Sequence, residues 1–166
     1  MLAGCYECPE NTWTHEATKA SQGSIIVKYS FCVSSLANDT RSETAKSIEE
    51  LGGIAIQHTI SYGNRIQTDV ASQLKNPKLS TDFRIAFQSC FTYYSDAIPK
   101  LESALNSFGS RDYPTAHQNL VSAMDASTDC QDAFDGIGSP TSMREDSSYF
   151  FSLTAIPFVL TNILAG

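Results

Sequence analysis

Hydrophobic residues recur every three or four positions through most of the chain from about residue 40 onward. That spacing places them on one face of an α-helix. It predicts a first long helix over about 48–74, which must end at Asn76 and Pro77 because proline cannot supply a helical amide. The pair Gly52 and Gly53 is a candidate break, since each glycine costs about 1 kcal/mol relative to alanine. The predicted apolar face comprises Ile48, Leu51, Ala55, Thr59, Tyr62, Ile66, Val70 and Leu74.

A second helix is predicted over about 83–108, with Gly109 as its C-terminal cap. Pro99 lies inside this pattern and removes one helical hydrogen bond. We therefore expect a bend between Ser95 and Pro99, or else two separate helices. The apolar face comprises Phe83, Phe87, Cys90, Tyr94, Ala97, Leu101, Ala104 and Phe108.

A third helix should begin at Asp112, a good N-cap residue, with Pro114 in its first turn. Its apolar positions are mostly small, so it can approach its neighbours closely. They are Ala116, Leu120, Ala123, Ser127, Cys130 and Phe134.

The residues from Gly136 to Pro140 have the composition of a turn. The last helix carries Tyr149, Leu153, Ile156, Leu160 and Ile163 on one face. Four amphipathic helices with short connections can bury their apolar faces only against each other. We therefore predict an all-α, antiparallel up-down-up-down four-helix bundle over 39–166, preceded by an N-terminal extension over 1–38 with a short helix at about 25–36.

Composition restricts the class of partner. A chain of 166 residues with 42% hydrophobic residues can fill one core. A formal charge of −7 disfavours nucleic acid and anionic membranes, and it favours a basic protein partner. No apolar run approaches the roughly 20 residues of a membrane helix. We expect a monomer that binds neither nucleic acid nor membrane.

Catalytic and metal-binding patterns are absent from the sequence. It contains no G-x-S-x-G, P-loop or H-E-x-x-H motif, and no histidine has a glutamate three residues before it. Cys5, Cys8, His15 and Cys32 do not have the spacing of a zinc finger. His58 and His117 are interpreted as structural histidines. We therefore expect no enzyme, no cofactor and no metal site.

Five cysteines suit an oxidising compartment, and their odd number leaves one unpaired. A disulfide from either Cys5 or Cys8 to Cys32 is the simplest interpretation of the N-terminal group. Asn38 begins a glycosylation sequon. The first ten residues lack the pattern of a signal peptide, so either a signal has been removed or the chain begins atypically.

Cys90 and Cys130 lie on the apolar faces of two different predicted helices. A bridge between them would close a loop of roughly 40 residues and stabilise the fold by about 4 kcal/mol. Their neighbours form an ordered series: Cys90, Tyr94, Asp96, Ala97 and Ile98; Asp112 and Tyr113; Ser122 and Ala123; then Cys130, Asp132 and Phe134.

With supporting segments at 29–36, 51–52 and 153–156, this series resembles the plant invertase and pectin methylesterase inhibitor family over about 24–166. Segments 56–58 and 65–67 resemble pollen-type members labelled invertase inhibitors, so the chain is allergen-like. The resemblance implies a secreted protein of the plant cell wall, the extracellular apoplast, or the vacuole. It also implies a disulfide between Cys90 and Cys130 and a second disulfide in the N-terminal extension. The expected first cysteine of that second pair is Ala17 here, which leaves Cys5 or Cys8 as the partner of Cys32.

The family implies inhibition through a stoichiometric complex that covers the target's active-site cleft. Invertase inhibitors are similar to one another in a Pro-Lys-Phe string between the second and third bundle helices. The segment from Arg111 to Pro114 instead resembles the pectin methylesterase (pectinesterase) inhibitors, although Asp129 replaces a threonine common in the family. We expect an esterase inhibitor, with an invertase inhibitor and a non-inhibitory ligand-carrying or structural pollen-type bundle as alternatives. The expected partner-binding residues are Gln88, Thr92, Asp96, His117, Asp125 and Asp129.

Overall fold

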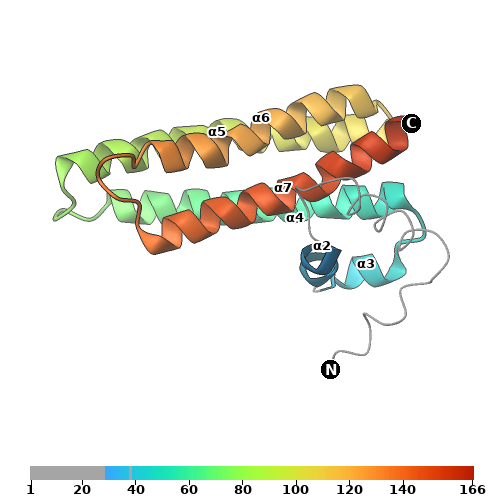
Figure 1. The fold of residues 1–166 in the computed structure, drawn as a ribbon, viewed down its shortest axis with the longest axis horizontal. Coiled ribbons are helices and arrows are strands. Elements are labelled where there is room, and N and C mark those ends of the chain that lie inside the picture. The colour runs from blue at the N-terminus through green and yellow to red at the C-terminus, as the bar shows by residue number, and fades with distance from the viewer. Residues whose placement is uncertain (1–28, 38) are drawn as a thin grey trace.

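The computed structural model describes residues 29–37 and 39–166, and every regular element within them is a helix. The four long helices lie side by side as an antiparallel bundle, with the two short helices beside one end (Figure 1). The predicted all-α four-helix bundle is therefore confirmed. The elements are α2 (Tyr29–Leu36), α3 (Thr40–Thr44), α4 (Ile48–Leu74), α5 (Thr81–Gly109), α6 (Tyr113–Asp132) and α7 (Thr141–Ala165).

Three of the long helices begin at a side chain that accepts a hydrogen bond from a free backbone amide, as N-caps do. Ser47 accepts from the amide of Glu50 at the start of α4. Ser80 accepts from the amide of Phe83 at the start of α5. Asp112 caps α6 through the amide of Thr115, which confirms the predicted cap.

Two predicted interruptions are not breaks. α4 runs without interruption through Gly52 and Gly53, and α5 is one helix across Pro99 rather than two. A Cβ atom at position 52 would lie 2.1 Å from a ring carbon of Phe108, so glycine at this position lets α5 pack against α4. A Cβ atom at Gly63 would lie 2.7 Å from Ile98 on the same neighbour.

The end of α5 differs from the prediction that Gly109 forms its cap. Gly109 is the last helical residue, and the left-handed conformation belongs to Arg111, at φ 62°. The amide of Asp112 donates to the carbonyl of Ser107, and that of Arg111 donates to the carbonyl of Phe108. This pair of bonds is a Schellman motif with arginine at the position that glycine usually occupies.

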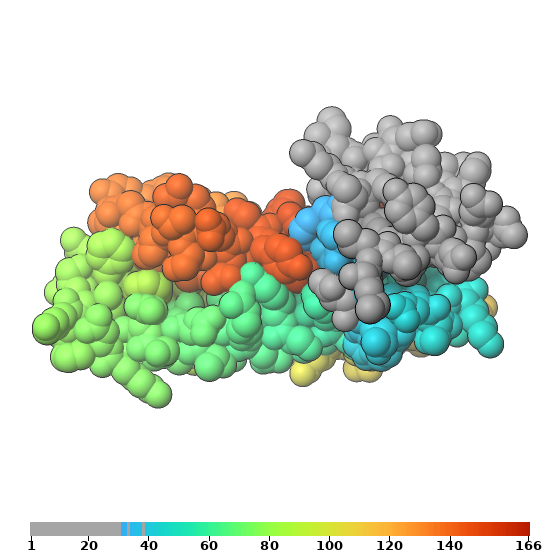
Figure 2. All heavy atoms as spheres, turned by 90° about the horizontal axis from the view of Figure 1, so that it is seen from below, coloured from blue at the N-terminus to red at the C-terminus, as the bar shows by residue number. Residues whose placement is uncertain are grey.

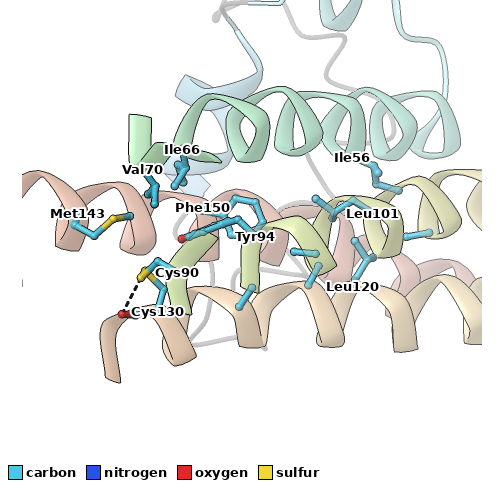
Figure 3. Close-up of a cluster of buried hydrophobic side chains, with 14 of the residues drawn as sticks. Ile56, Ile66, Val70, Cys90, Tyr94, Leu101, Leu120, Cys130, Met143 and Phe150 are labelled. Carbon is cyan, nitrogen blue, oxygen red and sulfur yellow. Dashed lines mark hydrogen bonds between the residues drawn. A yellow bond between two sulfur atoms is a disulfide. The ribbon is translucent and has the colours of Figure 1, made fainter. Parts of the chain in front are cut away.

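The main core lies between α4, α5, α6 and α7, and Figure 3 shows part of it. α5 and α6 contribute many alanines to it, as predicted from the small apolar positions of the third helix. A second apolar cluster joins α2 to the start of α4 and to the second half of α7. Among its contacts, Phe31 meets Tyr149 edge-on at 5.4 Å.

The N-terminal prediction is tested only in part, because residues 25–28 lie outside the described residues. α2 covers the rest of the predicted short helix. The sequence pattern did not predict α3, which buries no side chain and therefore has no apolar period. Asp39 caps α3, and the neighbouring Arg41 guanidinium lowers the pKa of its carboxyl to about 2.

α7 is the one helix among the described residues that is long and apolar enough to cross a membrane by length and composition. Half of its apolar window is buried inside the bundle. A core helix of a soluble protein meets the same criterion, and α7 packs here against α4 and α6.

Candidate partner-binding surface

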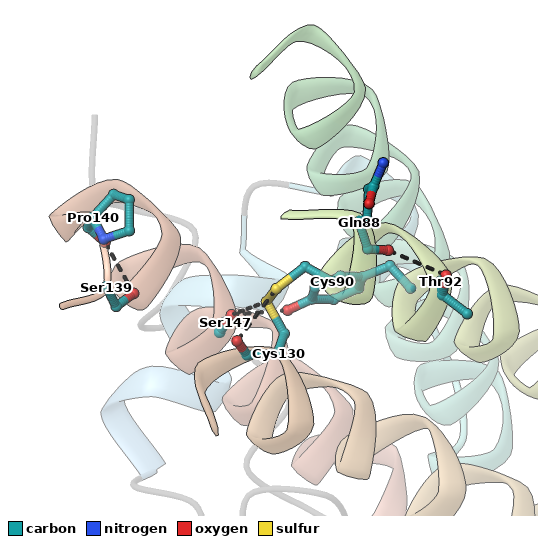
Figure 4. The surroundings of a disulfide bond; sticks show 8 residues. Gln88, Cys90, Thr92, Cys130, Ser139, Pro140 and Ser147 are labelled. Atoms are coloured by element: carbon teal, nitrogen blue, oxygen red, sulfur yellow. Dashed lines mark hydrogen bonds between the residues drawn. A yellow bond between two sulfur atoms is a disulfide. The ribbon is translucent and has the colours of Figure 1, made fainter. Parts of the chain in front are cut away.

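A disulfide between Cys90 and Cys130 joins α5 to α6, as the sequence predicted (Figure 4). The two Cα atoms are 4.6 Å apart, and neither cysteine is exposed to solvent. Nearby, the ring of Phe87 meets that of Phe134 edge-on at 5.1 Å. The start of α5 and the end of α6 are therefore held together by both a covalent bond and aromatic packing.

A buried polar chain ties α7 to this bridge. The hydroxyl of Tyr94 donates to Ser147 Oγ at 3.1 Å, and the hydroxyl of Ser147 lies 3.7 Å from the sulfur of Cys130. Burial raises the pKa of Tyr94 well above its ordinary value of 10.0. Tyr94 thus acts as a neutral hydrogen-bonding group inside the core.

The outer face of the α5–α6 pair carries five of the six predicted partner-binding residues, all of them exposed. They are Gln88, Thr92 and Asp96 on α5 and Asp125 and Asp129 on α6. The α5 residues are spaced four apart, which puts them on one side of the helix. Because Cys90 opposes Cys130 on antiparallel helices, Asp96 and Asp125 lie at nearly the same level along the bundle.

The carboxylates on this outer face make no ion pair within the part of the chain that the structure describes. The ion pairs found there join Arg41 to Asp39, and Arg65 to Asp69 and to Asp146. α6 itself contains no lysine or arginine. Asp96, Asp125 and Asp129 therefore form an acidic surface without ion pairs among the described residues, and the exposed Lys100 lies one turn after Asp96 on α5.

The structure does not bring His117 to this surface. Its Nδ1 lies 3.3 Å from Thr161 Oγ1, and its ring lies 4.5 Å from that of Phe158. Both neighbours belong to α7, so His117 is half-buried at the α6–α7 seam. The spacing of the sequence placed it correctly off the core but could not tell which neighbouring helix it faces.

A polar contact between α4 and α7 was not predicted. The hydroxyl of Tyr62 donates to Asp146 Oδ1 at 2.8 Å, and Arg65 pairs with the same carboxylate at 2.6 Å. The Arg65 guanidinium lies 4.3 Å from the centre of the Tyr62 ring. Burial and the bond to Asp146 raise the pKa of Tyr62. More than 80 residues separate these groups in the chain, so no local pattern connects them.

The remaining predicted sites concern the N-terminal region. Cys32 is buried and has no disulfide partner among residues 29–37 and 39–166, and burial raises the pKa of its thiol to about 11. Cys5, Cys8 and Asn38 lie outside the described residues. Within those residues, no group of three histidine, cysteine or acidic side chains could hold a metal ion.

The sequence profile of the family described as plant invertase/pectin methylesterase inhibitor matches residues 15–159. The chain belongs to this inhibitor family. A Platanus acerifolia protein named as an invertase inhibitor is 36% identical over 151 residues, covering 89% of this chain and 82% of that protein. A pectinesterase inhibitor from Actinidia deliciosa is 28% identical, covering 82% of this chain and 74% of that protein.

The fold has a counterpart among solved structures. A mutant form of a pectin methylesterase inhibitor from Arabidopsis matches with a TM-score of 0.77 and 20% identity. The match covers 89% of this chain and 96% of the solved one. As a member of the inhibitor family, the protein is an inhibitor acting through protein–protein contact and not an enzyme. Its relatives are named for two different targets.

Proposed function

We propose that this inhibitor acts on a plant pectin methylesterase, forming a stoichiometric complex in which the α5–α6 outer face covers the active-site cleft. The observation that carries the proposal is the acidic surface of Asp96, Asp125 and Asp129, which form no ion pairs with the described residues, on the two helices that the disulfide joins. Charges already paired within a protein contribute less to a partner than charges left free. Here the free carboxylates lie on the most strongly braced pair of helices.

This arrangement suits a basic target for two physical reasons. Complementary charge speeds the encounter of two proteins and makes their association sensitive to salt. A surface whose helices are already locked together loses less conformational entropy on binding. The net charge of −7 also attracts a basic target at long range.

The esterase is preferred to invertase because the α5–α6 connection contains Arg111, Asp112, Tyr113 and Pro114 and no Pro-Lys-Phe string. Arg111 and Asp112 are both engaged in the Schellman motif and the α6 cap, so this connection is compact. Invertase remains the second candidate, supported by the 36% identity to the Platanus acerifolia protein. Asp129, at the position of a common family threonine, would then mark a changed specificity.

Several features of the family extend the proposal. We propose secretion to the apoplast, the cell wall or the vacuole, with residues 1–38 as an extension to a bundle domain over 39–166. A disulfide between Cys32 and either Cys5 or Cys8 would brace that extension, and Asn38 would be glycosylated. These assignments suit the five cysteines and the sequon.

The test is a titration of the purified protein into assays of a pectin methylesterase and an invertase at fixed enzyme concentration. We expect one-to-one inhibition of the esterase that weakens as salt is added. Inhibition of invertase alone would reject the esterase as the target and favour the second candidate, invertase. Absence of inhibition of either enzyme at micromolar protein would overturn it and favour a non-inhibitory carrier or structural bundle.

A matched pair of variants locates the surface. Asp125→Lys with Asp129→Lys reverses two charges on the proposed face and should weaken inhibition by about tenfold or more. Glu43→Lys with Glu145→Lys makes the same change in net charge at exposed positions on α3 and α7, away from that face, and should have a small effect. Equal losses in both variants would mean that net charge, not this surface, governs binding. Asp129→Thr alone tests whether this residue sets the choice between the two enzymes.

A further inference from the structure

The opposite side of the bundle carries an open groove of about 640 Å³ between the second half of α4 and the start of α7. Leu79, in the connection between α4 and α5, also lines it. The walls lie side by side in Figure 2, with α7 in orange and α4 and the start of α5 in green. α4 and α6 each pack against α5 and α7, so this α4–α7 side is the reverse of the α5–α6 face.

The floor of the groove is apolar. Phe83 and Leu79 are only half-buried there, and so they offer apolar surface to an incoming group. The aromatic and aliphatic side chains together make a surface suited to one large apolar side chain. The floor residues are Ile66, Val70, Leu79, Phe83, Phe87 and Met143.

The rim of the groove is acidic. Asp69 lies on the α4 wall, and Glu145 and Asp146 lie on the α7 wall. Among the described residues that line the groove, Arg65 is the only basic one, which leaves two carboxylates in excess. Arg65 and Tyr62 both bind Asp146, whereas Asp69 is 3.5 Å from the guanidinium and Glu145 has no ion pair with a described residue. Asp69 shares the single Arg65 guanidinium with Asp146, and Glu145 has no ion partner among the described residues, so the rim keeps a net negative charge with a carboxylate on each wall.

We propose that this groove docks a short segment of a partner protein in which a large apolar side chain lies next to a lysine or arginine. The apolar side chain would cover Phe83 and Leu79, and the basic group would lie between Asp69 and Glu145. Charge complementarity selects this occupant over a second copy of the chain, because two molecules of charge −7 repel each other.

The shape of the groove favours a segment of a protein over a small molecule. Pockets for small ligands enclose most of the ligand's surface, and this groove is only partly enclosed. An open groove between two helices can accept a continuous peptide chain. Because the groove and the α5–α6 face lie on opposite sides, both surfaces can be occupied at the same time.

The test measures binding of a fluorescent peptide, acetyl-Gly-Lys-Leu-Phe-Lys-Gly-amide, to the full chain at low ionic strength by fluorescence anisotropy. A peptide with glutamate in place of both lysines serves as the charge control. We expect binding of the basic peptide and much weaker binding of the acidic one. No binding of the basic peptide at concentrations up to about 1 mM, or equal binding of both peptides, overturns the proposal.

Two variants place the peptide in the groove. Asp69→Lys with Glu145→Lys should weaken binding by about tenfold, whereas Glu43→Lys with Glu102→Lys should leave it nearly unchanged. Leu79→Ser removes part of the apolar surface in a connecting segment and should lower the affinity at high salt as well as low salt. If the Asp69→Lys, Glu145→Lys variant and Leu79→Ser both bind like the wild type, the peptide lies elsewhere and the proposal is wrong.

The outcome is separable from that of the proposed inhibitory function. Asp69→Lys with Glu145→Lys should still inhibit the target enzyme as the wild type does, since neither residue lies on α5 or α6. A saturating amount of peptide should likewise leave inhibition unchanged. Competition between the peptide and the enzyme would show that the two surfaces are not independent, and this would contradict the proposed second site.

Discussion

The α5–α6 pair and the α4–α7 pair use polar and covalent chemistry in opposite ways. α5 and α6 are joined by the Cys90–Cys130 disulfide and by small apolar side chains, and the carboxylates of their outer face have no ion partners among the described residues. α4 and α7 have no covalent link within the described residues. They are instead tied by Tyr62, Arg65 and Asp146, and they leave a groove at one end.

This difference decides whether charged side chains hold the helices together or are left free to bind a partner. Where a disulfide and apolar packing hold two helices together, their outer charges are not needed internally and are free for a partner. Where charges themselves join the helices, fewer remain free and the packing is less complete. The acidic α5–α6 face therefore suits a preformed binding surface. The α4–α7 side is the place where the bundle can admit another group.

The largest predicted effect concerns the covalent link of the first pair. Replacing Cys90 and Cys130 together by alanine should lower the free energy of unfolding by about 4 kcal/mol, because the loop between them is no longer closed in the unfolded chain. Urea denaturation followed by circular dichroism measures this change. Wild-type protein whose Cys90–Cys130 disulfide has been reduced should show the same lower free energy of unfolding. An unchanged free energy of unfolding would mean that packing alone holds α5 to α6.

A smaller effect is expected where α4 meets α5. Gly52→Ala should destabilise the protein by about 1–2 kcal/mol, because the new methyl group overlaps the buried Phe108 ring and this outweighs the gain in helix propensity. Gly53→Ala is the matched control, since nothing lies within 4 Å of its Cβ position. It should be neutral or stabilise by up to about 1 kcal/mol. Thermal unfolding measures both variants. If their midpoint temperatures shift in the same direction, the overlap with Phe108 does not decide the effect of Gly52→Ala.

The smallest effect is expected for two tyrosines that hydrogen-bond to α7, Tyr94 on α5 and Tyr62 on α4. Burial raises the folded-state pKa of Tyr94, and burial with the bond to Asp146 raises that of Tyr62. Each raised pKa stabilises the folded state below the unfolded value near 10 and loses this contribution as the pH rises above it. The loss should reach about 1.4 kcal/mol per pH unit for fully buried Tyr94 and be smaller for partly exposed Tyr62.

The measurement is the free energy of unfolding between pH 9 and pH 11 for Tyr94→Phe and Tyr62→Phe. Both variants should show a shallower decline than the wild type, and the change should be greater for Tyr94→Phe. Tyr93→Phe is the control, because the Tyr93 hydroxyl makes no hydrogen bond with the described residues. Identical slopes for Tyr94→Phe and the wild type would show that the buried hydroxyl ionises without cost.

Local sequence patterns predicted most of the bundle. The four long helices, the Asp112 cap and the turn at 136–140 follow from periodicity and from residues with strong conformational preferences. The prediction failed at Gly52, where a local preference met a distant contact, and at the end of α5, where the left-handed position fell on another residue. Gly52 looks unfavourable in a helix until the Phe108 ring is seen against it, and Gly109 was a better local candidate for the left-handed position than Arg111.

The candidate surface was predicted in the same uneven way. Spacing correctly placed Gln88, Thr92 and Asp96 on the outside of one helix, because these positions follow from helical geometry alone. The same reasoning could not assign His117 to the α7 side of α6. α6 packs between α5 and α7, and the sequence pattern does not say which of these helices a residue at the edge of the apolar face meets. The groove was not foreseen, because its walls come from segments about 75 residues apart in the sequence.

The sequence by itself determined which segments form the four long helices and which side of each is apolar, because these properties depend on neighbours within four or five positions. It also pointed to the two cysteines that join α5 and α6. Only the tertiary structure decided which charges are paired and which are free. Ion pairs such as Arg65 with Asp146 join distant parts of the chain, and their geometry exists only once the helices have packed.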